Sequence, residues 1–453
     1  MPAIGLVGLG HVGLPLAVAF DEAGSSVVGY DIDPEKIRRL QNGCDPTGLI
    51  DTDRLASSDI AFTTEAAQLQ GTDYVIIAVP TPLDAANTPD VSSLESTGLT
   101  VGRYISPGTT VTLESTVYPG ATREILVPAL EETSNLEAGA DFSVAYTPER
   151  INPGNNGPAF AEIVKLVGGL DGTALERAAT LYETVVDAGV YRVPSIEVAE
   201  TAKCLENTQR DANIALINEF AMACHHLGID SAAVLDAANT KWNFHDYTPG
   251  LVGGHCLPVD PHYLAYAVNQ AGYAPELIRT ARETNEQVSD FVAELVIDAL
   301  AARRAALASY TEDVAKPSVT DPHADGYTMR GDALHDERLL VLGLTYKANS
   351  TDIRGAPIRD VIDQLQARGL EAIGYDPYAD IDDLEQAYSI PIQETLNTDG
   401  ADGVLVSVPH DEFLSLGLDT LRASMNDRPV LIDVMGTFRD RTPSKHGFHY
   451  KTL

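Results

Sequence analysis

A cysteine in a glycine- and proline-rich loop has the neighbours expected of a nucleophile. Cys256 follows Gly253 and Gly254, which allow backbone conformations that other residues resist. Pro258 stiffens the exit from the loop, and a carboxylate, Asp260, stands four residues after the cysteine. Free cysteines are more often buried as small hydrophobic residues, but such a loop favours presentation of the thiol. An ionised thiol at this place would be a nucleophile able to form a covalent intermediate with a substrate.

A second set of residues has the spacing of a dinucleotide-binding turn. Between an apolar run at residues 3–7 and a helical pattern at residues 14–20 lie Gly8, Gly10, His11, Val12 and Gly13. The first two glycines allow a tight turn and bring a pyrophosphate close to the N-terminus of a helix. A further apolar run at residues 26–30 ends at Asp31, which can accept both ribose hydroxyls and would repel a 2′-phosphate. This order predicts NAD rather than NADP as the cofactor.

Polar residues follow three further strands predicted in the first half of the chain. These strands are expected at residues 73–79, 110–116 and 142–146. Thr81, Thr116 and Glu149 lie at or just beyond their carboxyl ends, where open parallel sheets bind ligands. Each of the three is a candidate ligand contact, with the capping of a strand end as the alternative.

A long helix is predicted from Ile196 over about 30 residues, because apolar residues recur there at helical spacing. Lys203 and Asn207 are four residues apart and share a face, and Arg210 lies on about the same face. A polar face of this kind is usually solvated, but it is also a suitable donor side for a catalytic pocket. A second long helix is predicted near residues 275–302.

The C-terminal part repeats the alternation of strand and helix. Strands are expected at residues 339–344, 371–376, 403–408 and 430–434, with a helix at residues 358–368. Gly374, Tyr375 and Asp376 repeat the end of the 26–30 strand, but the glycine motif is absent, so the ligand need not be a dinucleotide. We expect an α/β protein with two Rossmann-like, doubly wound parallel sheets joined by a central long-helix segment.

The formal net charge of −36, from 66 acidic and 30 basic residues, argues against nucleic acid as a partner. Only eight of the basic residues are lysine, and this composition predicts a halophilic protein of a salt-rich cytoplasm. The four cysteines are scattered without a CxxC pair, which argues against disulfides and against a metal site. No apolar run is long enough to span a membrane, and the first strand starts too early for a signal peptide, so we expect a cytoplasmic protein.

Together these motifs resemble the UDP-glucose/GDP-mannose dehydrogenase family, over essentially the whole chain. The matching residues are Gly8-x-Gly10-x-x-Gly13, Glu114-Ser115-Thr116, Pro148-Glu149-Arg150, Lys203-x-x-x-Asn207, Gly253-Gly254-His255-Cys256 with Asp260, and Tyr346-Lys347…Asp352-Ile353-Arg354. The resemblance implies an enzyme that oxidises the C6 alcohol of a nucleotide sugar to a carboxylate and reduces two NAD+. It also implies a homodimer or a larger homo-oligomer.

The resemblance implies a role for each of these residues. Cys256 would form a thiohemiacetal and then a thioester, while Lys203 and Asn207 stabilise charge at C6. Asp260 and Thr116 could position water or relay protons. Glu149 is the other carboxylate, and the sequence does not choose between Glu149 and Asp260 as the base.

The remaining predicted contacts concern the cofactor and the substrate. The cofactor would be held by the glycine turn with Asp31, Thr81 and Thr116, and Arg354 would reach it from the second sheet, which places the active site between the two sheets. The predicted substrate contacts are Arg150, Lys203, Asn207, Gly253, Tyr346, Lys347 and Arg439.

One departure from the residues of the UDP-glucose enzymes predicts which sugar this protein would accept. The UDP-glucose branch carries a second glutamate four residues after the position of Glu149, where this chain has Pro153. The surrounding residues resemble enzymes acting on UDP-N-acetylhexosamines for surface polysaccharides. UDP-N-acetylglucosamine is the first expectation, and UDP-N-acetylmannosamine, UDP-N-acetylgalactosamine and UDP-glucose are alternatives.

The predicted domains follow from the same resemblance. They are a NAD-binding Rossmann domain (1–195), a central helical dimerisation domain with the cysteine loop (196–305), an acidic linker (306–338) and a UDP-binding Rossmann-like domain (339–453).

Three other functions fit less well. A nucleotide-sugar epimerase would need a Tyr-x-x-x-Lys pair, which the first domain lacks. A β-hydroxyacid dehydrogenase would need neither Cys256 nor a second sheet. A non-catalytic nucleotide sensor would not need the thiol, the lysine and the carboxylates together.

The charge generates a prediction about salt. Repulsion among carboxylates weakens as the Debye length falls from about 10 Å at 0.1 M salt to about 3 Å at 1 M. We therefore expect activity and melting temperature to rise steeply toward molar KCl. Full activity after dialysis into dilute buffer would contradict this prediction.

Overall fold

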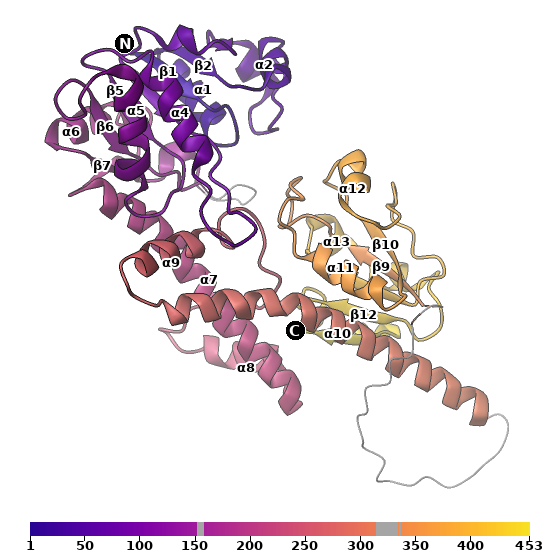
Figure 1. Cartoon of the computed structure of the whole chain (residues 1–453). Helices are drawn as coiled ribbons and strands as arrows, with labels where there is room; N and C mark the ends of the chain where they lie inside the picture. The colour runs from indigo at the N-terminus through magenta and orange to yellow at the C-terminus, as the bar shows by residue number, and fades with distance from the viewer. Residues whose placement is uncertain (152–157, 314–333, 335–336) are drawn as a thin grey trace. The chain divides into compact units, whose positions relative to one another are not determined.

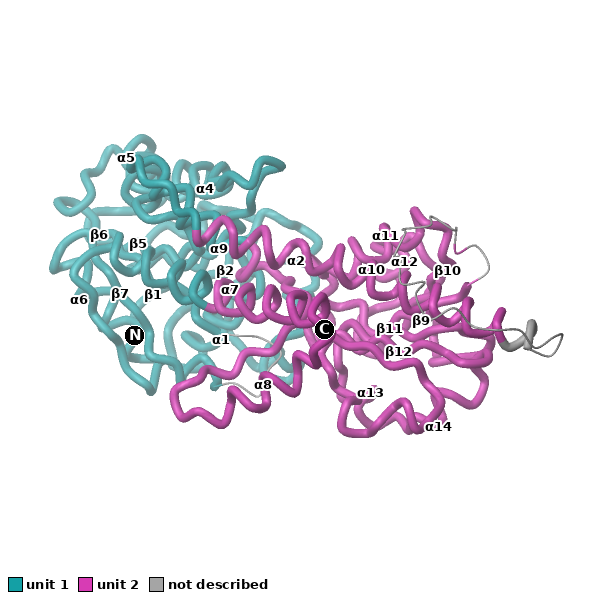
Figure 2. Tube along the Cα trace, turned by 90° about the horizontal axis from the view of Figure 1, so that it is seen from below, with its two compact units in different colours: residues 1–209, 259–276 teal, residues 210–258, 277–453 magenta. Residues whose placement is uncertain are grey.

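The computed structural model describes residues 1–151, 158–313, 334 and 337–453. The chain forms two compact units, which Figure 2 shows in different colours. Unit 1 comprises residues 1–209 and 259–276, and unit 2 comprises residues 210–258 and 277–453. The chain passes between the units within helix α7 (Ile196–Leu227), before helix α9 (Asp260–Gln270), and at the start of helix α10 (Glu276–Asp313).

The described residues of unit 1 contain one eight-stranded sheet, in the order β3-β2-β1-β4-β5-β6-β7-β8. The strands are β1 (Ala3–Val7), β2 (Ser26–Tyr30), β3 (Ala61–Thr63), β4 (Tyr74–Ile77), β5 (Thr110–Leu113), β6 (Ser143–Tyr146), β7 (Lys165–Gly169) and β8 (Val190–Val193). The first six strands have the order of a dinucleotide-binding sheet. All neighbouring strands are parallel except β6 and β7, which are antiparallel.

Helices cover both faces of this sheet, because alternate residues of each strand point to opposite sides. Ile4 and Leu6 of β1 pack in one apolar cluster with Leu14 of α1, whereas Val7 packs in another with Leu94 of α4. The main helices of unit 1 are α1 (Gly13–Glu22), α2 (Pro34–Gln41), α3 (Thr52–Ala56), α4 (Ser92–Gly102), α5 (Val127–Ser134), α6 (Gly172–Tyr182) and α9.

Within residues 337–453, unit 2 contains a five-stranded parallel sheet in the order β10-β9-β11-β12-β13 (Figure 1). Its strands are β9 (Arg338–Leu342), β10 (Glu371–Tyr375), β11 (Gly403–Val406), β12 (Val430–Asp433) and β13 (His449–Thr452). Its helices are α8 (Ser231–Asn239), α11 (Ile358–Ala367), α12 (Ile381–Ala387), α13 (Asp411–Ser415) and α14 (Leu418–Arg422), besides most of α7 and α10. This is the other common doubly wound order, with a switch point between β9 and β11.

Apolar residues of α10 attach this long helix to the second sheet. Val288, Val292 and Val296 recur every four residues and are fully buried in one cluster with Leu339 and Val341 of β9. The predicted fold class of two Rossmann-like sheets with long helices is therefore confirmed.

The structure differs from the predicted elements in three respects. Strands β3, β7, β8 and β13 were not predicted, because β3 has only three residues, β7 ends in two glycines, and β8 and β13 are partly exposed. Helix α10 continues to Asp313, beyond the predicted end near Ala302, since an alanine- and arginine-rich stretch without glycine or proline extends it. Pro153 and most of the predicted linker lie outside the described residues.

No helix among the described residues is long and apolar enough to cross a lipid bilayer.

Candidate active site

The glycine turn after β1 has the geometry that a pyrophosphate needs. Gly8 has φ +90°, and a Cβ there would lie 2.5 Å from the carbonyl oxygen of Ala78. A Cβ on Gly13 would lie 1.8 Å from the oxygen of Gly8, so both positions exclude larger residues. By contrast, no atom lies within 4 Å of a Cβ built on Gly10, which leaves room above the turn. Helix α1 begins there without a side-chain cap, and the N-terminus of a helix favours an anion.

Asp31 lies at the end of β2, where a ribose would be recognised. Its Oδ2 accepts hydrogen bonds from the backbone N–H of Leu9 (2.9 Å) and from Nζ of Lys36 (2.8 Å), and its Oδ1 accepts from Asp33 N–H (3.0 Å). These bonds fix the carboxylate against the glycine turn, and the residues present fit NAD. Lys36 was missed by the sequence analysis, although a lysine five residues after the acid, in the next helix, was a usable signal.

The ends of β4 and β5 are joined directly. Oγ1 of Thr81 donates to the carbonyl oxygen of Thr116 (2.6 Å), and Oγ of Ser115 donates to Val79 (2.7 Å). The hydroxyl of Tyr263, from α9, donates to the carbonyl of Thr81. The two predicted threonines, Thr81 and Thr116, therefore lie together just beyond the carboxyl ends of β4 and β5, where Tyr263 of α9 contacts Thr81.

A buried polar cluster connects α7 with the first residue of α9. Nδ2 of Asn207 donates to Oδ2 of Asp260 (2.5 Å), and Lys203 lies one turn before Asn207 on α7. All three residues are buried. Burial raises the pKa of Asp260 to about 6, although the charge of Lys203 and the hydrogen bond from Asn207 lower it. A carboxylate with this pKa is ionised at neutral pH and is still basic enough to accept a proton.

A second buried acid, Glu114, has a different environment. Its Oε1 accepts bonds from Thr147 Oγ1 and the hydroxyl of Tyr182, and its Oε2 contacts Nζ of Lys165 at 2.7 Å. Burial raises the pKa of Glu114, and the charge of Lys165 opposes this effect. Nζ of Lys165 also lies 3.7 Å from Oε2 of Glu149, so Lys165 braces both carboxylates.

The two predicted base candidates therefore differ in how they are held. Oε1 of Glu149 accepts the backbone N–H groups of Arg150 and Ile151, both at 2.6 Å. Its oxygens are thus directed to the chain itself and to Lys165, which the sequence analysis missed. A single lysine at the start of the apolar strand β7, in a chain with eight lysines, was the available signal. Arg150 in turn pairs with Glu206 of α7 at 2.6 Å.

In unit 2, the cysteine loop packs closely against the loop that follows β9. The N–H of Gly254 donates to the carbonyl of Gly355 (3.0 Å), and a Cβ on Gly254 would lie 2.8 Å from the ring of Tyr346. Gly254 has φ +91°, and only glycine suits both that conformation and that contact. Gly253 is also close to this loop, because a Cβ on Gly253 would lie 2.6 Å from the carbonyl oxygen of Gly355. Cys256 is exposed just beyond this contact.

The predicted UDP contacts lie on the same loop. Burial raises the pKa of Tyr346, and the charges of Asp352 and Cys256 raise it further. Burial also lowers the pKa of Lys347, as does the positive charge of Arg210, the first residue of α7 that belongs to unit 2. A half-buried lysine beside an exposed arginine favours an anion such as a diphosphate.

The other predicted arginines of unit 2 have acidic partners. Arg354 makes a two-pronged hydrogen bond with Asp352, with Nε to Oδ1 and Nη2 to Oδ2 both at 2.9 Å. Arg439 pairs with two acids of the α8 region, Asp236 at 2.7 Å and Asp230 at 3.7 Å. Among the described residues, no group of three or more histidine, cysteine or acidic side chains is placed to hold a metal ion.

The sheet order, the glycine turn and Asp31 define the class of this protein, a dehydrogenase that uses NAD. Family profiles match along the chain: the NAD binding domain of the UDP-glucose/GDP-mannose dehydrogenase family at residues 2–186, its central domain at residues 197–287, and its UDP binding domain at residues 340–440. The chain belongs to this family, and it is an NAD-dependent nucleotide-sugar dehydrogenase. The predictions of family, enzyme class and cofactor are confirmed.

Similar proteins extend over almost the whole chain. Protein CapL of Staphylococcus aureus is 40% identical over 96% of this chain and 95% of its own length. UDP-N-acetyl-D-glucosamine 6-dehydrogenase of Pseudomonas aeruginosa is 38% identical over 95% of this chain and 96% of its own length. The solved structure of UDP-D-ManNAc dehydrogenase from Pyrococcus horikoshii superposes with a TM-score of 0.82 at 31% identity, covering 100% of this chain and 99% of that one.

The environment of Asp260 generates a prediction about pH. If Asp260 accepts a proton during the reaction, it must be ionised, so kcat/KM should fall as the pH decreases through about 6. Asp260→Asn should lose most activity, and the residual activity should no longer show this acid limb. The measurement is the pH profile of kcat/KM for both proteins.

Glu200 provides a matched control, because burial raises its pKa to about 7 while its oxygens accept bonds from Gly120 and Thr122. Glu200→Gln should retain the limb near pH 6. An unchanged limb in Asp260→Asn, or its loss in Glu200→Gln, would contradict the assignment.

Proposed function

We propose that this protein oxidises the C6 hydroxyl of a UDP-N-acetylhexosamine to a carboxylate, with UDP-N-acetylglucosamine as the preferred substrate. The main evidence for a four-electron oxidation is the exposed thiol of Cys256. Its loop packs through Gly253 and Gly254 against the loop that contains Tyr346 and Lys347. A simple alcohol dehydrogenase has no need of a nucleophile at such a place.

The proposal assigns proton transfer and charge stabilisation to Lys203, Asn207 and Asp260, and the role of nucleophile to Cys256. When bound, NAD+ accepts a hydride from C6, and two NAD+ molecules are used in turn for each sugar. Asp260 takes the proton of the C6 hydroxyl, while Lys203 and the second N–H of the Asn207 amide stabilise negative charge on the oxygen.

Covalent capture then carries the aldehyde to the acid. The thiolate of Cys256 attacks the aldehyde carbon, and the resulting oxyanion takes back the proton held by Asp260 to give a thiohemiacetal. Loss of the second hydride from C6, and of the hydroxyl proton to Asp260, which passes it to solvent, leaves a thioester on Cys256. Asp260 accepts a proton from water as the water oxygen attacks the thioester carbonyl, the carbon–sulfur bond breaks, and the carboxylate leaves. Thr116 and Glu149 remain candidates for placing that water.

The UDP half of the substrate is proposed to bind on unit 2. Tyr346 would contact the uridine, and Lys347 with Arg210 would contact the diphosphate, since their mutual repulsion is relieved by an anion. The match to the family's UDP binding domain over residues 340–440 supports this placement. We keep Arg150, Gly253 and Arg439 as further substrate contacts and Arg354 as a cofactor contact.

The choice of sugar rests on the relatives and on one residue. The names of the P. aeruginosa and Salmonella typhi relatives, at 38% and 37% identity, specify UDP-N-acetyl-D-glucosamine. The relative named for UDP-N-acetyl-D-mannosamine, from P. horikoshii, is 34% identical, so that sugar is the alternative. Pro153 replaces the carboxylate of the UDP-glucose branch and favours an N-acetyl group over a hydroxyl. A homo-oligomeric assembly, a cytoplasmic location and adaptation to high salt remain predictions.

The first prediction of this proposal concerns the nucleophile. Cys256→Ser should reduce complete turnover to the acid by at least about a thousandfold, because a serine hydroxyl is poorly ionised and an oxygen ester hydrolyses slowly. The measurement is formation of the uronic acid over time. Cys44→Ser, at another exposed cysteine, is the matched control and should remain active. Near-native acid formation by Cys256→Ser would refute the thioester route.

The second prediction concerns the sugar. A site that pairs the donor and acceptor of an acetamide rejects a bare hydroxyl strongly, so kcat/KM for UDP-N-acetylglucosamine should exceed that for UDP-glucose by at least about a hundredfold. The assay compares UDP-N-acetylglucosamine, UDP-N-acetylgalactosamine, UDP-N-acetylmannosamine and UDP-glucose side by side. Equal or faster turnover of UDP-glucose would overturn the branch assignment and leave the cysteine mechanism intact.

A further inference from the structure

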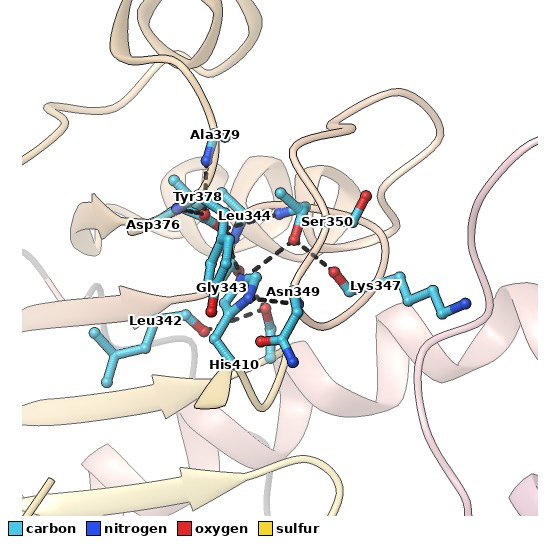
Figure 3. A network of polar contacts seen from close by, with 12 residues as sticks. Leu342, Gly343, Leu344, Lys347, Asn349, Ser350, Asp376, Tyr378, Ala379 and His410 are labelled. Carbon is cyan, nitrogen blue, oxygen red and sulfur yellow. Dashed lines mark hydrogen bonds and ion pairs between the residues drawn. The ribbon is translucent and has the colours of Figure 1, made fainter. Parts of the chain in front are cut away.

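The second sheet repeats the acid of the first sheet but gives it a different environment. Asp376 follows β10 as Asp31 follows β2, with the same Gly-Tyr before it. The side chain of Asp376 is fully buried. Its oxygens accept four backbone N–H groups, namely those of Leu344 (2.7 Å), Thr345 (3.2 Å), Tyr378 (2.9 Å) and Ala379 (3.1 Å), as Figure 3 shows in part. Asp376 thus binds backbone N–H groups of the protein, whereas Asp31 is placed to bind a ribose.

His410, from the turn after β11, completes this network. Its ring is fully buried, and its Nδ1 accepts the backbone N–H of Asn349 at 2.9 Å (Figure 3). An accepting Nδ1 carries no proton, so the proton of the ring is on Nε2. Nε2 lies 3.0 Å from Oδ2 of Asp376 and 3.3 Å from Oγ1 of Thr345. One ring therefore ties the loop after β9 to the ends of β10 and β11.

The orientation of the imidazole is fixed by its neighbours. The ring of Tyr378 stacks on it with 4.9 Å between centroids and 21° between planes, and Phe413 meets it edge-on at 5.3 Å. Burial opposes ionisation of Asp376, but the hydrogen bond with His410 and the backbone N–H groups hold the pKa of that carboxyl below its usual range. The acceptor for the Nε2 proton is therefore a carboxylate.

The segment that this network holds is residues 345–349. At its start, Oγ1 of Thr345 contacts His410 and donates to the carbonyl of Lys347 (3.0 Å). At its end, Asn349 has φ +57° and its Oδ1 accepts the N–H of Asp411 (3.0 Å), beside its own bond to His410. Tyr346 and Lys347 lie between these two anchors.

We propose that His410, oriented by Asp376, is a positioning residue for the UDP site, which holds residues 345–349 in the conformation that presents Tyr346 and Lys347. This inference rests on the proposed function, in which those two residues bind UDP. Ordering a loop costs conformational entropy, and a loop ordered before binding does not draw that cost from the binding free energy. Loss of His410 should therefore weaken UDP binding without affecting the cofactor site in unit 1.

The test compares His410→Ala and His410→Asn with the unaltered full-length protein, by calorimetric titration with UDP and separately with NAD+. His410→Ala should raise the Kd for UDP about tenfold or more and leave the Kd for NAD+ within about twofold. His410→Asn, whose amide oxygen can still accept from Asn349 N–H, should recover part of the loss. The same substitution at the exposed His449 of β13, His449→Ala, is the matched control and should change neither Kd.

A double variant separates positioning from general destabilisation. If His410 acts through the loop, His410→Ala should weaken UDP binding less in a Lys347→Ala background than in the unaltered protein. An unchanged Kd for UDP in His410→Ala, equal weakening of UDP and NAD+, or an undiminished effect in the Lys347→Ala background would each overturn the inference.

The same titrations distinguish a failure of the proposed function. Absence of UDP binding by the unaltered protein, or unchanged UDP binding in Lys347→Ala, would refute the proposed UDP site itself. Weakened binding in Lys347→Ala with no effect of His410→Ala would retain that site and refute only the role of His410.

Discussion

Burial of ionisable side chains is the constraint on which this account depends, because a buried charge is tolerated only with partners that offset its loss of solvation. Glu114 has Lys165, Thr147 and Tyr182 around it, and Lys165 also lies 3.7 Å from Glu149, so this lysine braces both carboxylates. Asp260 has only one hydrogen bond among its described contacts, from Asn207, besides the charge of Lys203. Its raised pKa reflects this incomplete compensation, and for that reason we propose Asp260 rather than Glu149 as the base.

Each sheet has an aspartate directly after its second strand in the chain, but the two aspartates have different partners. Asp31 is bonded to the glycine turn and Lys36 and lies where a ribose approaches. Asp376 is enclosed by backbone N–H groups and His410, and it fixes the loop that carries the proposed UDP contacts. In the first sheet, Gly8 and Gly13 allow the backbone itself to approach an anion. In the second sheet, we propose that the side chains of Tyr346 and Lys347 serve this purpose, so that the nucleotide site needs no glycine motif.

Much of this could be predicted from the sequence, because some signals are local. Strands β1 and β2 and the start of α7 lie where the periodicity placed them, and the glycine turn was recognisable from spacing alone. The sequence could not choose between Glu149 and Asp260, since burial and partners decide a pKa. Lys165 and His410 were missed because their partners lie far away in the sequence. Glu114 is 51 residues from Lys165, and Asp376 is 34 residues from His410. Strand β7, short and antiparallel to β6, carries no pattern that identifies its partner.

The central claim is that the aldehyde stays bound to Cys256 and leaves only as the acid. It is tested most directly by incubating the protein in molar KCl with excess NAD+ and a limiting amount of the preferred UDP-sugar, with hydroxylamine present to trap free aldehyde. NADH is measured by absorbance and the sugar products by mass spectrometry. The account predicts two NADH per sugar consumed and no trapped aldehyde. One NADH per sugar with accumulation of the aldehyde adduct would contradict it.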